Sequence, residues 1–416
     1  MSSVLLDGMT AFTSGTAGLL VLLLGLPVAA VALYQVALAF AAFFYRGFDA
    51  AGTARTPPQT RVAVLVPAHD EAELIARCVR SLLDQTYPSE LYEVVVIADN
   101  CSDDTPRLAA EAGAEVLVRN DLTARGKGHA LRFAIDRVLA REPAPDAIAV
   151  VDADSVAGRD FLEALVAPFE RGAAAAQGES LLSDEGSAGA ALRAAAFLLV
   201  NRVRPSGRAV LGLPTTLAGN GMLFGRRLLE SQPWDAFSAA EDVEYTIRLR
   251  LAGIGPAFAG GAILLSPTAP TSEAATQQQL RWEGGKMHVA RTQIPRLVAS
   301  AFRLRRPLLL EAAFELAVPP LGLVAALAGV GSVVVGVLAL VDVLPAWSVT
   351  PWLVALAAIP VYVLVGLRAA RAPRSAYRSL LQAPVLVLRK VFGAHRLFTF
   401  RADSWVRTQR GSEDRD

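Results

Sequence analysis

The distribution of apolar and polar residues divides the chain into a mixed central part and two strongly apolar ends. Residues 17–44 contain no charged residue, and residues 312–341 and 350–367 form two further long apolar runs. All three runs reach or exceed the length of about 17–25 residues that an α-helix needs to cross a bilayer. The pattern therefore predicts one membrane-spanning helix before the central part and two after it.

Basic residues are distributed unevenly around these runs, and this asymmetry predicts their orientation. Arg46, Arg55 and Arg61 follow the first run and four arginines lie within 368–378, whereas the loop 342–349 has no basic residue. Lys and Arg are retained on the cytoplasmic side of a membrane protein. We therefore expect a multi-pass protein of the cell (inner) membrane, with its central part cytoplasmic and the loop outside.

Two further stretches near the C-terminus predict helices that lie along the membrane surface. Residues 296–316 combine arginines with apolar residues just before the chain enters the bilayer. Residues 377–392 are too short between their charges to span comfortably, so they form a second interfacial helix, which we favour, or a re-entrant segment. The expected organisation is a transmembrane helix in 1–50, a cytoplasmic domain in 51–290, interfacial and transmembrane helices in 291–395 and a basic cytoplasmic tail in 396–416.

The central part alternates short apolar runs with amphipathic stretches. The short runs are residues 61–68, 92–99, 114–118 and 146–154. Continuous apolar runs of this length are typical of parallel strands buried on both faces, and the helical spacing of apolar residues between them predicts connecting helices. The repeated unit predicts a doubly wound α/β domain, in which ligands bind beyond the carboxyl ends of the strands.

Polar side chains gather at these predicted strand ends. Asp99 ends the second strand, and Asp152 and Asp154 end the fourth strand. Lys127 lies in the glycine turn that opens the helix after the third strand. A rim of carboxylates is costly unless a cation or a hydrogen-bonding ligand offsets the like charges. Asp152 and Asp154 provide the oxygen ligands that Mg²⁺ or Mn²⁺ prefers, so the rim is the candidate site of the domain.

Composition narrows the classes of function. The formal net charge of +1 creates no field that would attract nucleic acid. The two cysteines, Cys78 and Cys101, are too few for a disulfide framework or a metal site, and we interpret them as ordinary thiols. The apolar fraction of 53% is high for a soluble protein, which agrees with the predicted spans.

With these elements in this order, the sequence resembles membrane-bound family 2 glycosyltransferases of the cellulose-synthase, hyaluronan-synthase and poly-N-acetylglucosamine-synthase type. The resemblance covers residues 61–290 by motif and the flanking helices by their layout. It implies an α/β GT-A domain flanked by transmembrane helices. The segments that carry it are VLVPAHDE, ARGKGHAL, VDADS, LAGNGMLFGRRLL, AAEDVEYTIRL and QQQLRWEGG. The chain departs from the family pattern at Asp70, where Asn is usual, and at Ala240, where Thr is usual.

The resemblance implies a donor site for a nucleotide-diphosphate sugar, with UDP as the expected nucleotide. The residues that it assigns to the donor are Pro67, Glu71, Asp99, Lys127, Asp152, Asn220 and Gly221. Within this group Glu71 would contact the ribose and Asp99 the uracil edge. Asp154 would hold the divalent cation, Mg²⁺ or Mn²⁺.

The resemblance also implies an acceptor side. Asp242 would be the catalytic base, next to Glu241, and Gln278, Arg281 and Trp282 would lie near the acceptor and the diphosphate. A sugar ring stacks well on an indole, and Arg meets diphosphate oxygens as a forked cation. The alternative is that Trp282 anchors the chain at the membrane interface and that Arg281 is its snorkelling neighbour.

The expected function is therefore inverting transfer of a UDP-linked hexose or N-acetylhexosamine to a growing polysaccharide at the membrane. Three spans are too few to line a polymer-wide pore, so export would need an export partner or a homo-oligomer. Single addition to a lipid or glycolipid acceptor among the membrane lipids is the alternative. A non-catalytic membrane scaffold and a transporter are weaker alternatives, because the motif residues are intact and intramembrane charges are few.

Overall fold

The computed structural model describes residues 2–47, 58–183, 188–268 and 272–385, and its first four strands match the apolar runs of the central part. The strands are β1 Val62–Ala68, β2 Tyr92–Asp99, β3 Glu115–Arg119, β4 Ala147–Val150, β5 Val156–Ala157, β6 Ala175–Leu182, β7 Met222–Gly225 and β8 Ala257–Ser266. The fourth predicted strand ends earlier than expected, so Asp152 and Asp154 lie in the turn that follows β4.

The helices connect these strands and then form the C-terminal part. They are α1 Ser2–Ala42, α2 Ile75–Leu83, α3 Thr105–Glu111, α4 Lys127–Leu139, α5 Phe161–Glu170, α6 Ala188–Leu198, α7 Arg204–Val210, α8 Arg226–Ser231, α9 Glu241–Leu251, α10 Ser272–Leu304, α11 Leu308–Ala317, α12 Leu321–Leu340, α13 Thr350–Ala369 and α14 Arg374–Ser379. Single-turn or π segments occupy Ser89–Leu91, Leu199–Val203, Ala346–Val349 and Leu380–Gln382.

The strands form one mixed sheet in the order β3-β2-β1-β4-β7-β6-β8-β5. The half made of β3, β2, β1 and β4 is parallel, whereas β7 runs antiparallel to both β4 and β6. The predicted parallel sheet is therefore confirmed for the first four strands. The second half is mixed because β7 enters the sheet in the opposite direction.

Each central strand contributes side chains to two hydrophobic cores, one on either face of the sheet. Val64 packs in the core that contains Ile75 of α2, and its neighbour Leu65 packs in the core that contains Leu131 of α4 and Tyr245 of α9. Successive residues of a strand point to opposite faces. The continuous apolar runs of the sequence follow from this double burial.

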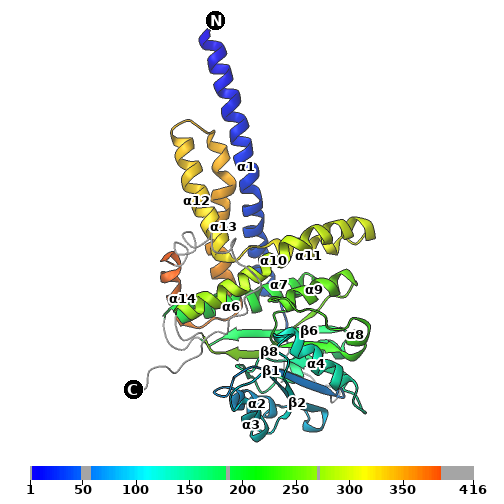
Figure 1. The fold of residues 1–416 in the computed structure, drawn as a ribbon. Coiled ribbons are helices and arrows are strands. Elements are labelled where there is room, and N and C mark those ends of the chain that lie inside the picture. Colours follow the sequence, from blue (N-terminus) through cyan, green and yellow to red (C-terminus); the bar gives the residue numbers. More distant parts are fainter. Residues whose placement is uncertain (1, 48–57, 184–187, 269–271, 386–416) are drawn as a thin grey trace.

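In the described part of the chain, three helices are long and apolar enough to cross a membrane: Ser14–Ala42, Leu321–Leu340 and Ala346–Ala369. Figure 1 shows α1, α12 and α13 side by side on one side of the molecule, with the sheet on the other. The second span begins later than the predicted start at residue 312. Pro319 and Pro320 cause this difference, because the residue before a proline avoids helical geometry and α11 therefore ends at Ala317.

The predicted interfacial helix 296–316 is wrong as a single element. Helix α10 continues to Leu304, Arg305 adopts a left-handed φ of 53°, and Pro307 precedes the separate helix α11. A positive φ cannot continue a right-handed helix, so the chain turns at this point. The predicted helix 377–392 is described only as far as residue 385, as the end of α14 and a short turn, and residues 386–392 lie outside the described residues.

A buried ion network connects α1 to the α/β domain. Arg208 of α7 donates hydrogen bonds to Tyr34 Oη of α1 at 2.6 Å and to Glu315 of α11 at 2.9 Å. Its other terminal nitrogen lies 2.6 Å from Glu311, which also accepts a hydrogen bond of 2.8 Å from Arg250 of α9. The Arg208 side chain is only 4% exposed. The network thus connects the first candidate span with α9.

The orientation of the spans is a testable prediction. In variants without native thiols, a membrane-impermeant maleimide should label Val343→Cys in intact cells, because the loop 342–349 has no basic residue to retain it inside. Arg227→Cys, an exposed position on α8 of the α/β domain, should react only after permeabilisation. Labelling of Arg227→Cys in intact cells would contradict the predicted topology.

Candidate active site

Lys127 joins three segments at the carboxyl edge of the sheet. It is the first residue of α4 and follows Gly126, whose φ of 110° allows the turn. Its Nζ donates to Asp152 Oδ1 at 2.5 Å and to the Gly219 carbonyl at 2.6 Å, and it lies 3.9 Å from Glu241 Oε1. The ammonium group therefore holds the turn after β4, the loop before β7 and the start of α9 together.

The Lys127 ammonium remains charged in this setting. Burial lowers the pKa of Lys127, but the carboxylates of Asp152 and Glu241 outweigh burial, so the pKa is raised. The site thus has a permanent cation among its acidic groups. A fixed cation of this kind is suited to a ligand that carries negative charge, such as a diphosphate.

Hydrogen bonds of the buried Asn220 side chain hold the loop before β7 in place. Asn220 is buried, and its side chain accepts a hydrogen bond from Asp152 N at 3.0 Å and donates one to Ser155 Oγ at 2.8 Å. Gly219 and Gly221 have φ of 75° and 73°, in the left-handed region that favours glycine. The predicted residues Asn220 and Gly221 thus lie next to Asp152, and the Asn220 side chain shapes the loop.

Gln177 of β6 is a residue of this site that sequence reasoning missed. Its Nε2 donates to the Asn220 carbonyl at 2.7 Å, and its Oε1 accepts from Ala218 N at 2.8 Å. The side chain is buried and fixes both ends of the glycine turn. A single glutamine in an apolar run carries no motif, so only the pairing of β6 with β7 could find it.

Asp242 and Glu241 are the first residues of α9 and face the same loop. Asp242 Oδ2 lies 3.3 Å from the point where a Cβ on Gly219 would stand. Burial raises the pKa of Asp242 to about 7, the charge of Glu241 adds to this effect, and the Val243 N–H and Lys127 oppose it. Burial also raises the pKa of Glu241, against the attraction of Lys127. A carboxyl that titrates near pH 7 is suited to act as a general base.

Asp99 forms a buried ion pair at the end of β2. Arg119 at the end of β3 donates to Asp99 Oδ1 at 2.6 Å and also binds Asp121 at 3.0 Å. Sequence reasoning missed Arg119, whose side chain is 7% exposed. Pro67 and Glu71 are half-buried at the neighbouring end of β1. The strand order β2-β1-β4 therefore brings these predicted residues to the same edge as Asp152.

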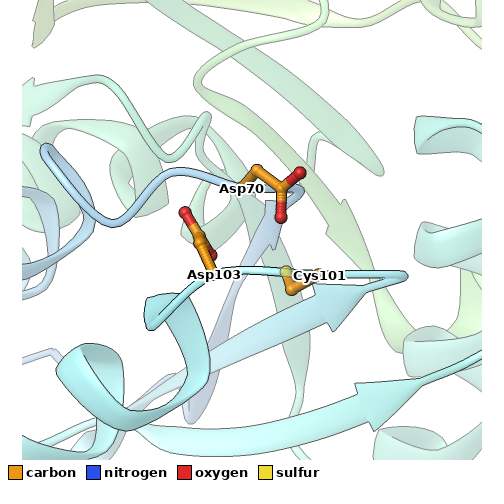
Figure 2. Close-up of side chains that lie close together, drawn as sticks. All are labelled: Asp70, Cys101 and Asp103. Carbon is orange, nitrogen blue, oxygen red and sulfur yellow. The ribbon is translucent and has the colours of Figure 1, made fainter.

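A second group of possible ligands, Asp70, Cys101 and Asp103, lies between the loops after β1 and β2 (Figure 2). Asp70 Oδ1 accepts a hydrogen bond from Ser102 N at 2.6 Å, and Asp103 accepts from Ala72 N at 3.1 Å and Thr105 N at 3.0 Å. Burial raises the pKa of the Cys101 thiol to about 11, so it is protonated at neutral pH and a poor metal ligand. These contacts make the group a brace between two loops.

Asp152 and Asp154 fit a hard divalent cation by the chemistry of their donors. Both are half-buried, and the buried Ala153 separates them. Asp152 Oδ1 contacts Lys127, and Asp154 accepts a hydrogen bond from Ser155 at 3.3 Å. Carboxylate oxygens without His or Cys in the same turn are the donor set that Mg²⁺ and Mn²⁺ choose.

Helix α10 carries the predicted Gln278, Arg281 and Trp282 and lies between the candidate spans and the sheet (Figure 1). Trp282 is 42% exposed, and its ring lies 5.5 Å from that of Phe197. Gln278 is half-buried, and the side chain of Arg281 lies outside the described residues. One turn beyond this motif, Gly285 of α10 lies against the loop before α9. A Cβ placed on Gly285 would stand 3.3 Å from the Cβ of Ala240.

The half-parallel sheet, the acidic turn after β4 and the half-buried Asp242 beside the Gly219 loop form a glycosyltransferase domain with a GT-A-like fold. The chain belongs to glycosyltransferase family 2. The family model described as "Glycosyltransferase like family 2" matches residues 57–285, more than half of the chain. The predicted family and fold class are thereby confirmed, and the assignment to the cellulose-synthase and hyaluronan-synthase type stays a prediction.

Curated relatives agree with this family. The probable glycosyltransferase YdaM of Bacillus subtilis is 26% identical over 59% of this chain and 59% of its own length. The beta-monoglucosyldiacylglycerol synthase of Trichormus variabilis is 32% identical over 46% of this chain and 41% of its own length. The chain thus spans well under two thirds of the length of these relatives.

Two solved structures that match the chain have low sequence identity and TM-scores below 0.5. The mannosyltransferase PcManGT from Pyrobaculum calidifontis, in complex with GDP-Man and Mn²⁺, is 19% identical with a TM-score of 0.46, covering 82% of this chain and 99% of its own. The glucosyl-3-phosphoglycerate synthase from Mycobacterium tuberculosis, with Mn²⁺, UDP and phosphoglyceric acid, is 24% identical with a TM-score of 0.37, covering 53% and 77%.

The close approach of Gly219 to Asp242 leads to a prediction with a matched control. Gly219→Ala should lower transfer by about tenfold or more, because the new Cβ would crowd the Asp242 carboxylate and misplace it. Gly212→Ala meets nothing within 4 Å at a similar φ of 69°. Both variants should lose about 1–2 kcal/mol of stability from the left-handed backbone. Equal activity of the two variants, measured with matched folded fractions, would contradict the prediction.

Proposed function

We propose that this protein transfers a sugar from a nucleotide-diphosphate sugar to an acceptor hydroxyl with inversion of the anomeric centre, and that Asp242 is the base. The observation that carries the proposal is the position of the Asp242 carboxylate against the Gly219 turn, next to Lys127. The base takes the proton of the acceptor hydroxyl as its oxygen attacks the sugar carbon. The bond to the diphosphate breaks on the opposite side, so no covalent enzyme intermediate is required.

The donor occupies the carboxyl edge of the parallel strands in this proposal. Asp99, fixed by Arg119, recognises the base, for which uracil is the first candidate. Glu71 and Pro67 border the ribose, and Lys127 attracts the diphosphate. The donor sugar is a hexose or an N-acetylhexosamine, and it lies near the turn formed by Asn220 and Gly221.

Asp154, together with Asp152 on the nucleotide side, would hold Mg²⁺ or Mn²⁺. When bound, the cation supplies positive charge that stabilises the leaving diphosphate. Lys127 contributes the same kind of stabilisation from the protein. Gln278 and Trp282 on α10 lie toward the acceptor, where the exposed indole offers a face for a sugar ring.

We place a lipid acceptor first and a growing polysaccharide second, which reverses the order expected from the sequence alone. Three candidate spans adjoin the catalytic domain in the described part of the chain, and α10 lies between these spans and the sheet (Figure 1). Relatives from Trichormus variabilis, Nostoc sp. and Synechocystis sp. carry the name beta-monoglucosyldiacylglycerol synthase. The exposed Trp282 favours the polysaccharide, because stacking on an indole suits a carbohydrate acceptor.

The acceptor is tested by the length of the product. Purified full-length protein in lipid nanodiscs with diacylglycerol and excess labelled nucleotide sugar should yield a singly glycosylated lipid that partitions into organic solvent. Long water-soluble chains would instead support the polysaccharide. No transfer with any donor of a nucleotide-sugar panel would overturn the proposed activity.

Asp242→Asn should remove transfer while nucleotide binding stays nearly intact. A base acts in the transition state, so kcat should fall by about 10²-fold or more with little change in donor affinity. Initial rates and calorimetric titration of UDP measure the two effects separately. Glu230→Gln, on the exposed side of α8, is the control and should behave as the unmodified protein. Full activity of Asp242→Asn would remove this residue from the mechanism.

The pH dependence follows from the raised pKa of Asp242, which is about 7. The base must be ionised to accept a proton, and its ionised fraction falls as the pH drops below this pKa. The value of kcat/KM, which reports the free enzyme, should therefore fall about tenfold per pH unit below pH 7 and level off above it. A profile that stays flat down to pH 5 would contradict the role of Asp242 as base.

Transfer should require a divalent cation, and Asp154→Ala should weaken the binding of UDP in the presence of Mn²⁺. The reason is the oxygen-only donor set of the turn after β4. Calorimetric titration of UDP with and without Mn²⁺ gives a readout that is independent of turnover. Asp136→Asn, an exposed substitution on α4, is the control. Unchanged turnover in excess chelator would disprove the requirement.

A further inference from the structure

A cavity of about 160 Å³ lies where α1 and α13 meet the catalytic domain. Its polar lining comes from Tyr45, Glu179, Arg202, Ser206 and Arg371. The lining does not include the residues of the candidate active site. The volume is far larger than the roughly 10–15 Å³ that one water molecule needs on this measure. The cavity therefore has room for a polar group of several atoms.

The described residues that line the cavity carry a net positive charge, from Arg202 and Arg371 against Glu179. Glu179 forms an ion pair with Arg202 and also accepts a hydrogen bond from Gly261 N at 2.8 Å. Arg371 is exposed and has no ion-pair partner among the residues that the structure describes. One guanidinium group thus remains uncompensated, and a guanidinium binds phosphate oxygens in a forked geometry.

Ser206 adds a neutral polar group to the same cavity. The residue is 5% exposed and lines the cavity. A hydroxyl can donate to an anionic oxygen. A hydroxyl and a guanidinium group that line the same cavity suit an anion better than a cation.

The cavity lies at the level where apolar spans give way to charged residues. Ala42 ends the span Ser14–Ala42, Ala369 ends the span Ala346–Ala369, and both line the cavity. The next residues after Ala42, Phe43 and Phe44, are 48% and 76% exposed. Exposed aromatic side chains at the end of an apolar span are typical of the membrane interface. Lipid headgroups are the anions that are abundant at this depth.

We propose that this cavity binds the phosphate headgroup of an anionic membrane lipid, with Arg371 and Ser206 as donors. The phosphate occupies the polar cavity, and the acyl chains pass over the small apolar residues at the ends of α1 and α13. The lipid then bridges the first and last candidate spans next to the catalytic domain. This site is separate from the acceptor site of the proposed reaction.

Native mass spectrometry of the full-length protein released from nanodiscs tests the proposal. With phosphatidylglycerol, the protein should retain one lipid, and Arg371→Gly should reduce its retention by about tenfold through loss of a charge-assisted hydrogen bond. Glycine is favoured at this position because Arg371 has a φ of 52°, so the variant should fold. Thermal unfolding and UDP binding of the variant check this point.

Arg374→Ala is the matched control, because Arg374 is an exposed arginine three residues along the chain that does not line the cavity. It should retain phosphatidylglycerol as the unmodified protein does. Equal retention by folded Arg371→Gly, or equally strong retention of phosphatidylcholine, would overturn the proposal. Displacement of the lipid by millimolar inorganic phosphate would assign the cavity to free phosphate and would also overturn it.

Discussion

The buried ion network around Arg208 is the constraint on which the arrangement of the whole protein depends. Removing such charges from water costs several kcal/mol per ion, and only close pairing with opposite charges offsets this cost. Arg208 meets Glu311 and Glu315 at hydrogen-bonding distance, and Arg250 approaches Glu311 from α9. Since α9 begins with Glu241 and Asp242, the network that contacts the first candidate span also holds the far end of the helix that presents the candidate base. The position of the candidate catalytic groups relative to the candidate spans follows from these pairs.

Pairing of opposite charges also organises the candidate active site. Lys127 lies among Asp152, Glu241 and Asp242, and the charge of one ammonium group offsets only part of that of three carboxylates. The raised pKa of Asp242 reflects this imbalance as well as burial. A bound cation would stabilise the excess negative charge of such a site, and the site could then bind a diphosphate. The excess of carboxylates thus favours the donor and a divalent cation binding together.

Two acidic groups at the same edge of the sheet have different roles because their hydrogen bonds differ. Asp70 and Asp103 accept hydrogen bonds from backbone N–H groups of neighbouring loops, so their carboxylates hold those loops in place. The carboxylate of Asp152 meets the ammonium group of Lys127, a contact that a ligand can replace or share. Proximity of carboxylates therefore does not identify a metal site until the partners of each oxygen are known.

The sequence by itself determined the family, the three apolar spans, the parallel half of the sheet and the residues at its carboxyl edge. These features follow from local periodicity and from short motifs at strand ends, which are properties of neighbouring residues. Gln177, Arg119 and the Arg208 network were decided only by the tertiary structure. Tyr34 and Glu315, for example, are 281 positions apart and form a hydrogen bond of 3.1 Å. The turn at Arg305 and the mixed half of the sheet were also decided by the tertiary structure. Contacts between segments that are distant in the chain provide the free energy that stabilises them.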